Sequence, residues 1–385
     1  MAKTYSTLSE LFTDIADAIR EKTGEAYLII ADDFPDVIRE RLQVIPSATS
    51  AYLTFSSPNS FTLKVNDTTK HWDGTLEYST DASTWSTWAG TTTLSSATSG
   101  SDNVLYLRGT GNTVITGSSN DCKWVLTGND ISCIGNIEYL LDYATVQSGA
   151  HPTMANYCYH SMFDSCTALT HAPTLPATTL ADYCYNSMFQ GCTSLTQAPA
   201  LPATTLADHC YYLMFSDCTA LTEAPALPAT TLASNCYQEM FYGCTSLTHA
   251  PTLPATTLAD YCYNSMFQGC TALTEAPSEL PATTLTEGCY MFMFEFTAIT
   301  AIPRIKARTY ATDSCKGMFD DIKTLNVYSR SGPGHTYGWT APASTYCSGM
   351  FGSDDKKSEW AKLDGSNFPN NGTPTEGVTY YFATV

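Results

Sequence analysis

The sequence predicts a mainly β protein with short helices, in which a helical module and a β-sandwich precede a solenoid of about eight coils of 26 residues. Two observations carry this expectation. Apolar residues alternate in short segments of the first third of the chain, as in half-buried strands. Farther on, the sequence repeats itself at a fixed step, which indicates units that bury their apolar faces only against their neighbours. Successive cysteines are 26 residues apart within each of two sets. The first set is Cys158, Cys184, Cys210, Cys236 and Cys262, and the second is Cys166, Cys192, Cys218, Cys244 and Cys270.

Residues 1–43 are predicted to form a helical anchoring or oligomerisation module. Thr7 and Glu10 have the spacing of a capping box, which opens a helix. A second short helix is expected from Asp33-Phe34-Pro35 onward, because proline fits a first helical turn. Two short helices cannot bury a core alone, so their apolar face packs on another copy, another protein or the next domain. We expect this anchoring face to consist of Leu8, Leu11, Phe12, Ile15, Ile19, Val37 and Ile38.

Residues 44–128 are predicted to form an Ig-like β-sandwich of short antiparallel strands. The runs FTLKV (61–65), GTLEYST (74–80) and NVLYLRG (103–109) alternate apolar and polar residues. Asp73-Gly74 is a hairpin signal between two of these runs. Exposed tryptophans could stack on sugar rings, but tryptophans of small sandwiches usually lie in the core. We therefore expect Trp72, Trp85 and Trp88 in the core.

Residues 129–154 are expected to be a transition that covers the first coil with a short helix or strand, because terminal repeats need a covering element. The solenoid then spans 155–355, and residues 356–385 form a C-terminal cap with VTYYF as its last strand. Met-Phe pairs mark the eight units at Met162-Phe163, Met188-Phe189, Met214-Phe215, Met240-Phe241, Met266-Phe267, Met293-Phe294, Met318-Phe319 and Met350-Phe351.

One unit, residues 181–206, shows what each repeat is expected to build. Asp182 precedes a segment, YCYNSMF, that we expect to be a short helix capped by this carboxylate. Ser234 replaces the aspartate in a later unit, which favours capping over metal binding because serine caps helices well. Gly191 is expected to end the helix in a left-handed conformation. The inward-facing side chains are predicted to be Cys184, Met188, Phe189, Cys192, Leu195 and Leu201, and LPATTL turns the chain into the next coil.

The fifteen cysteines are predicted to be buried free thiols. The N-terminus lacks the apolar core of a secretory signal, so we expect synthesis and folding in a cytoplasm, where thiols stay reduced. Equivalent residues of stacked coils lie about 5 Å apart, so disulfides along a column are geometrically possible in an oxidant. The spacing C-x7-C lacks the short ligand spacing of zinc sites. We expect no cofactor and no metal site.

The charge distribution excludes several partner classes. The formal net charge is −19, and no lysine or arginine lies between Lys123 and Arg304, whereas this stretch holds fourteen Asp and Glu residues. Nucleic acid and anionic membrane surfaces are therefore disfavoured, while neutral sugars, proteins and divalent cations remain. No segment has the apolar length of a membrane span.

An enzymatic function is not expected. The sequence holds no nucleophile elbow, phosphate loop or HExxH motif. Glu223 and Glu275 would lie about 10 Å apart, like an inverting glycosidase pair, but repeated surface acids lack the buried setting that raises the pKa of a catalytic acid. We expect no catalytic residues.

The motif MF-x-x-C-x-x-L at a 26-residue period resembles the bacterial surface repeat of the BspA-like leucine-rich-repeat family over residues 155–355. This resemblance implies a right-handed, LRR-like curved solenoid with a β-strand face that serves extracellular adhesion or recognition. The segments LSELFTDIADAIREKTG and IIADDFPDVIRERL are similar to short helical modules that open structural proteins of bacteriophages and prophages. A virion protein is made in the host cytoplasm without a signal peptide and leaves by lysis.

We therefore expect a virion appendage, a tail or fibre protein, whose N-terminal module contacts other virion proteins and whose acidic solenoid binds a host surface protein or a neutral glycan. A homo-oligomer is expected. The alternatives are a bacterial cell-surface adhesin, located at the cell surface, and a purely structural capsid, head-decoration or head-fibre protein.

The candidate recognition surface consists of positions that vary between units while the framework is constant, although such positions can also be merely solvent-facing. The preferred column precedes Ala-Pro and contains His171, Gln197, Glu223, His249 and Glu275. Two further columns contain Asn186, Tyr212, Gln238 and Asn264, and Gln190 and Tyr242.

Overall fold

A computed structural model describes residues 51–67, 69–118, 122–322, 325, 331–352 and 372–383. The described part contains many short strands, two short helices and no closed barrel, which confirms the mainly β class. The predicted helical module at 1–43 and its anchoring face lie outside the described residues.

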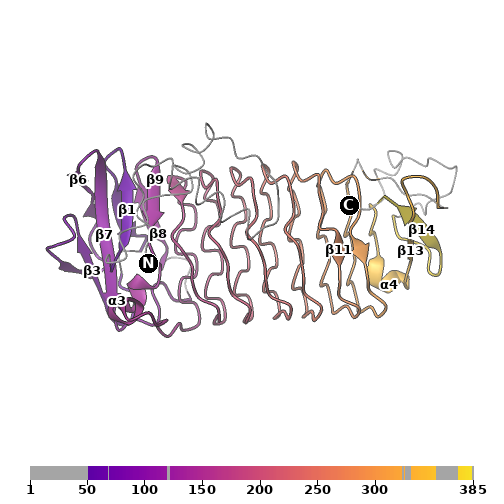
Figure 1. Cartoon of the computed structure of the whole chain (residues 1–385), viewed down its shortest axis with the longest axis horizontal. Coiled ribbons are helices and arrows are strands. Elements are labelled where there is room, and N and C mark those ends of the chain that lie inside the picture. Colours follow the sequence, from indigo (N-terminus) through magenta and orange to yellow (C-terminus); the bar gives the residue numbers. More distant parts are fainter. Residues whose placement is uncertain are drawn as a thin grey trace, which may run out of the picture. The chain divides into compact units, whose positions relative to one another are not determined.

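Two sheets form the first part of the described chain (Figure 1). In the larger sheet, neighbouring strands follow the order β10 (Leu169–His171), β9 (Ile131–Ile134), β1 (Leu53–Ser57), β7 (Asp102–Thr110), β3 (Thr75–Ser79) and β4 (Ser86–Trp88), and β6 (Ala97–Ser99) also pairs with β7. The smaller sheet has the order β5 (Leu94–Ser95), β2 (Thr62–Val65) and β8 (Trp124–Thr127). The three predicted apolar runs are confirmed as β2, β3 and β7.

Tryptophan side chains join the two sheets. The ring centroids of Trp88 in β4 and Trp124 in β8 lie 5.5 Å apart, and those of Trp72 and Trp88 lie 5.2 Å apart. Trp72 and Trp88 are buried as expected. Trp85 differs, because it is only half-buried and the Arg108 guanidinium lies 4.0 Å from its ring centroid.

The hairpin expected at Asp73-Gly74 is wrong. The strands on either side of it, β2 and β3, lie in different sheets, so no two-residue turn can join them. The Asp73 carboxylate instead accepts hydrogen bonds from the N–H and the hydroxyl of Thr113, at 2.8 and 2.7 Å. The Asp73 side chain therefore holds the segment in which the chain passes from the smaller sheet to the larger one.

Residues 115–118 and 122–137 take the place of a repeat unit upstream of the first one. The N–H of Ile115 donates to the Cys158 carbonyl at 2.8 Å, and the N–H of Trp124 donates to the Met162 carbonyl at 2.8 Å. β9 then pairs in parallel with β10 of the first unit. The chain continues into α3 (Tyr139–Gln147). The sequence predicted either a short helix or a short strand here, and the transition contains both.

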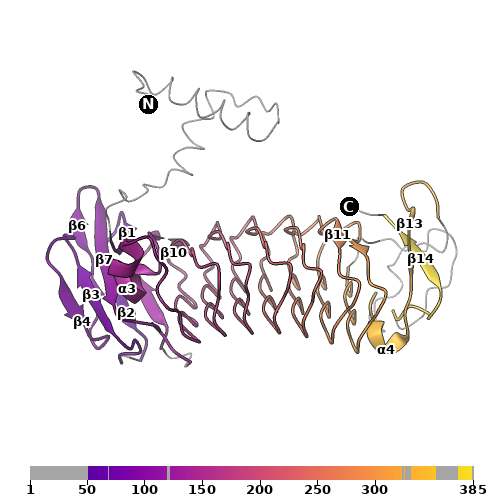
Figure 2. The same ribbon diagram turned by 60° about the horizontal axis from the view of Figure 1, so that its bottom comes forward.

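The repeat units stack in a row between this sheet and the C-terminal strands (Figures 1 and 2). In the unit 181–206, alternate residues donate to the next unit: the N–H groups of Tyr183, Tyr185 and Ser187 bond carbonyls 25 residues ahead, at 3.0, 3.0 and 2.8 Å. The residues that alternate with them, such as Asn186 and Met188, donate their N–H groups to the carbonyl three residues earlier in the same unit, at 3.2 Å each. The backbone of each unit is therefore hydrogen-bonded both internally and to the next unit.

The short helix expected in each unit is wrong, because the segment is a run of consecutive turns. Every fourth residue has a positive φ, as at Tyr183 (57°), Ser187 (53°) and Gly191 (67°). An α-helix would bond its N–H groups internally and leave few for the adjacent unit. Asp182 consequently caps no helix, and its Oδ1 accepts from the N–H of Asp208 in the next unit at 3.2 Å.

The predicted inward columns are confirmed, since all six inward side chains named for this unit are buried. The phenylalanine rings form a continuous stack from Phe163 to Phe351, with centroids 5.6–5.8 Å apart. Trp124 contacts its first ring and Phe382 its last, at 6.2 and 5.5 Å. A parallel stack of buried tyrosines was not foreseen and contains Tyr159, Tyr185, Tyr211, Tyr237, Tyr263 and Tyr290.

All fifteen cysteines are free and buried, as predicted. In the second column, Cys166 donates to the Trp124 carbonyl at 3.1 Å, and the four later thiols donate to the phenylalanine carbonyl of the preceding unit, for example Cys192 to Phe163 at 3.1 Å. Burial raises the pKa of the Cys218 thiol to about 12. These thiols are therefore framework groups.

Regular strands within the stack are very short. Apart from β10, the described units contain β11 (Glu279–Leu280), β12 (Arg304–Ile305) and isolated parallel bridges. Proline in each Ala-Pro and Leu-Pro step has no N–H to donate, which interrupts the ladder. At the far end, β13 (Tyr337–Thr340) pairs with β14 (Thr379–Phe382), so the predicted last strand is confirmed, and α4 (Ser344–Cys347) is a single turn.

Candidate recognition surface and polar pocket

The preferred column, which we call the bridge column, lies on the short parallel bridges between units. His171 pairs with Gln197, Gln197 with Glu223, and His249 with Glu275. Parallel pairing places equivalent side chains of adjacent units side by side, about 4.8 Å apart. All members except the half-buried His171 are exposed. The bridge column is therefore an accessible row of varied polar side chains on a fixed backbone.

Two members of the bridge column contact their neighbours in the row. His249 Nε2 lies 3.4 Å from Glu275 Oε1, and both side chains are about three-fifths exposed, at 62 and 61%. His171 Nδ1 lies within hydrogen-bond distance of the hydroxyls of Ser132 and Thr170, at 3.1 and 3.0 Å. Burial lowers the pKa of His171, which keeps its imidazole neutral over a wider pH range.

The second predicted column does not form one surface. Asn186 and Asn264 are only 5 and 4% exposed, so their amides lie inside the turn run and cannot contact a macromolecular partner. Tyr212 and Gln238 at the equivalent positions are half-buried. The sequence could not separate these cases, because a polar side chain at a varying position resembles a surface residue whether or not the backbone covers it.

The third column is partly accessible. Tyr242 is exposed and Gln190 is half-buried. The equivalent Gln268 donates to the carboxylate of Glu295 in the next unit. Burial, together with the nearby Asp320 and Asp321 carboxylates, raises the pKa of Glu295 to about 7.

A row of half-buried rings was missed. Tyr157 stacks on Tyr183 and Tyr183 on His209, with centroids 4.6 and 4.4 Å apart. The signal was present in the sequence, since these residues precede the first cysteine of successive units at the 26-residue step. Because the rings cover one another, their faces are occupied within the stack.

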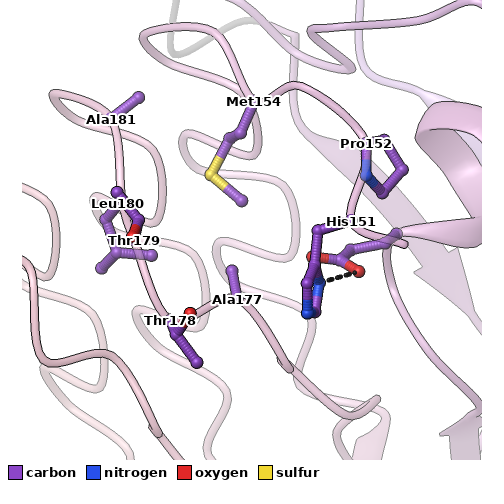
Figure 3. Close-up of a pocket in the computed structure, with 9 residues that line it drawn as sticks. His151, Pro152, Met154, Ala177, Thr178, Thr179, Leu180 and Ala181 are labelled. Carbon is purple, nitrogen blue, oxygen red and sulfur yellow. Dashed lines mark hydrogen bonds and ion pairs between the residues drawn. The ribbon is translucent and has the colours of Figure 1, made fainter. Parts of the chain in front are cut away.

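A polar pocket with a volume of about 330 Å³ lies where the larger sheet meets the first repeat unit (Figure 3). The side chains of Glu138 and His151 are in hydrogen-bonding contact in it, with His151 Nδ1 2.9 Å from Glu138 Oε2. Glu138 is 2% exposed and His151 55% exposed, so a buried carboxylate holds an accessible imidazole. Neither residue belongs to the repeat pattern, and their proximity depends on the tertiary fold.

Among the described residues, no group of three or more His, Cys, Asp and Glu side chains is arranged to hold a metal ion. None of the described helices combines the length and apolarity needed to cross a bilayer.

Comparison with known proteins finds no matching family model, no matching curated protein and no matching solved structure.

Proposed function

We propose that the stacked units form a solenoid of the BspA-like leucine-rich-repeat type that serves non-enzymatic recognition of a cell surface. The carrying observation is the contrast between constant buried columns and the varied, exposed bridge column. A rigid scaffold lowers the entropy lost on binding, and its varied polar side chains supply specificity.

We propose further that the protein is a phage virion appendage, a tail or fibre protein, which residues 1–43 attach to other virion proteins as a homo-oligomer. Its targets are a host surface protein or a neutral glycan, since residues 124–303 contain no lysine or arginine that would attract phosphates. The sequence resemblances support this proposal. The alternatives of a bacterial surface adhesin and of a structural head protein share the same scaffold.

Binding of the labelled full chain to a panel of bacterial cells tests recognition. A variant with Gln197, Glu223 and Glu275 changed to alanine should lose most of the cell binding, because these side chains are exposed and lie on one column. The matched control changes the exposed threonines Thr193, Thr219 and Thr271 of the same units to alanine and should bind as the wild type. Equal binding by both variants would overturn the bridge column as the recognition surface.

A further inference from the structure

The polar pocket forms where the chain leaves the larger sheet after β9 and enters α3. The N–H of Ile137 still donates to the Thr174 carbonyl of the first unit at 3.1 Å, and α3 begins two residues later. The segment 177–181, where the first unit continues into the second, therefore faces α3 and its following loop in place of another strand. Figure 3 shows this segment on one side of the pocket, with His151, Pro152 and Met154 on the other.

The Glu138–His151 contact sets the hydrogen-bonding character of the pocket. His151 Nδ1 lies 3.0 and 2.9 Å from the two Glu138 carboxylate oxygens, so Nδ1 carries the proton that this contact needs. The neutral ring then presents Nε2 as an acceptor. Glu138 is itself held in place, because its N–H donates to Asn136 Oδ1 at 2.8 Å. The imidazole is thus oriented before any ligand arrives.

The remaining lining residues narrow the chemistry of a ligand. Thr178 and Thr179 are exposed and supply hydroxyls, whereas Met154, Ala177 and Leu180 supply apolar contacts. The lining contains no lysine or arginine to neutralise an anion and no phenylalanine, tyrosine or tryptophan ring to stack on a planar base. Polar groups beside small apolar side chains suit a ring that carries hydroxyls at its edge and C–H groups on its face.

We propose that this pocket binds a neutral saccharide, with His151 Nε2 accepting a hydrogen bond from a ring hydroxyl. The Thr178 and Thr179 hydroxyls pair with further hydroxyls, and Met154 and Leu180 contact the C–H face. A volume of about 330 Å³ accommodates about one to two sugar rings. This site is separate from the bridge column and goes beyond the proposed function, since it stands whether or not that column binds cells.

Saturation-transfer NMR on the full chain tests the proposal with methyl glycosides of glucose, galactose, mannose and N-acetylglucosamine. At least one neutral glycoside should bind saturably, with a Kd on the order of millimolar, as expected for a small open site. His151→Ala should weaken that binding by about tenfold and Thr178→Val by several-fold, because each removes one hydrogen-bond partner.

His71→Ala is the matched control, because His71 is also a histidine in contact with a carboxylate, with Nε2 2.9 Å from Asp67 Oδ2, but lies outside both the pocket and the bridge column. It should leave glycoside binding unchanged. The circular dichroism of each variant verifies its folding. Three results would overturn the proposal: no saturable binding of any neutral glycoside, equal binding by His151→Ala, or binding of glucuronate as strong as that of the neutral sugars.

Discussion

Residues with a positive φ in the run of turns affect the stability of the protein, and substitutions at these positions can measure that effect. Asp217 has a φ of 58° where equivalent residues of other units are Gly191, Gly243 and Gly269. Glycine adopts this conformation without steric strain, although it gains more freedom in the unfolded chain. Asp217→Gly should therefore raise the free energy of unfolding by about 0.5 kcal/mol, the difference between these effects.

The reverse change should destabilise the protein. A Cβ on Gly243 would meet Asp217 Oδ1 at 2.3 Å, and its φ is 68°, so Gly243→Ala should cost about 1–2 kcal/mol. Thr219→Gly is the control at an exposed position for which no positive φ is recorded, and it should be destabilising. Chemical denaturation measures all three variants. An Asp217→Gly protein less stable than Thr219→Gly would contradict the left-handed conformation.

Glu295 makes stability depend on pH. Burial raises the pKa of its carboxyl from 4.5 to about 7, so between these values the folded chain holds a proton that the unfolded chain releases. The free energy of unfolding should therefore fall as the pH rises through this window. Glu295→Gln removes the titrating group and should stabilise the protein at about pH 8 by about 1 kcal/mol, a figure reduced for solvent screening of this half-buried side chain.

Denaturation at about pH 5 and about pH 8 compares this variant with Glu223→Gln, whose side chain is exposed. The control should show the same pH dependence as the wild type. If Glu295→Gln does so too, the carboxyl is not the source of the dependence.

Among the elements of the fold, the thiol columns give a chemical readout. All fifteen cysteines are buried, and burial raises the pKa of Cys192 well above its ordinary value and that of Cys210 to about 12. Because the thiolate is the reactive form, a disulfide reagent such as Ellman's should modify almost none of them in the native protein. All fifteen should react after unfolding in guanidinium without reductant. Fewer reactive thiols in the unfolded chain would reveal disulfides along a column.

The turn run shows where sequence reasoning reaches its limit at the scale of an element. Its left-handed residues recur every four positions, which is close to the 3.6-residue period of an α-helix. The inward positions Cys184, Met188 and Phe189 therefore fit both structures. The deciding fact is tertiary: alternate N–H groups bond the next unit, and only the stacked arrangement supplies those carbonyls.

For the whole described molecule, the sheets and the repeat units share one hydrophobic core. Trp124 contacts Trp88 in the larger sheet and Phe163 in the first unit, with centroids 5.5 and 6.2 Å away. Trp124→Ala should therefore lower the stability of both parts, by about 3–5 kcal/mol for a buried aromatic side chain. Trp85→Ala should have a much smaller effect, since Trp85 is half-buried on the outside of the sheet.

Hydrogen exchange checks this coupling. Backbone amides of β7 and of the unit around Phe215 should lose protection together in Trp124→Ala, because the tryptophan connects the two parts. Loss of protection in the sheets alone would show that they fold independently of the units.

The 26-residue step and the apolar character of the inward columns were enough to predict that the units repeat and that the cysteine, methionine, phenylalanine and leucine columns are buried, but not that a column of tyrosines is buried with them. The sequence could not show that residues 115–118 and 122–137 pack like a repeat unit, because they do not share its motif. It could not show the polar pocket either, because Glu138 and His151 meet only through the path of α3. The repeat and its apolar columns were therefore predictable, whereas the backbone conformation of the units, the tyrosine stack and the features at the junction were not.

The hydrogen bonds between units also allow whole units to be lost or duplicated without disruption of the stack. Each unit offers the same donors downstream and the same acceptors upstream, so removing or duplicating one 26-residue cassette rejoins matching surfaces and leaves both ends untouched. Each such event alters the length of the stack by about 4.8 Å, one strand spacing. In-frame recombination between near-identical cassettes can thus adjust the reach of this protein stepwise, without the evolution of a new terminus.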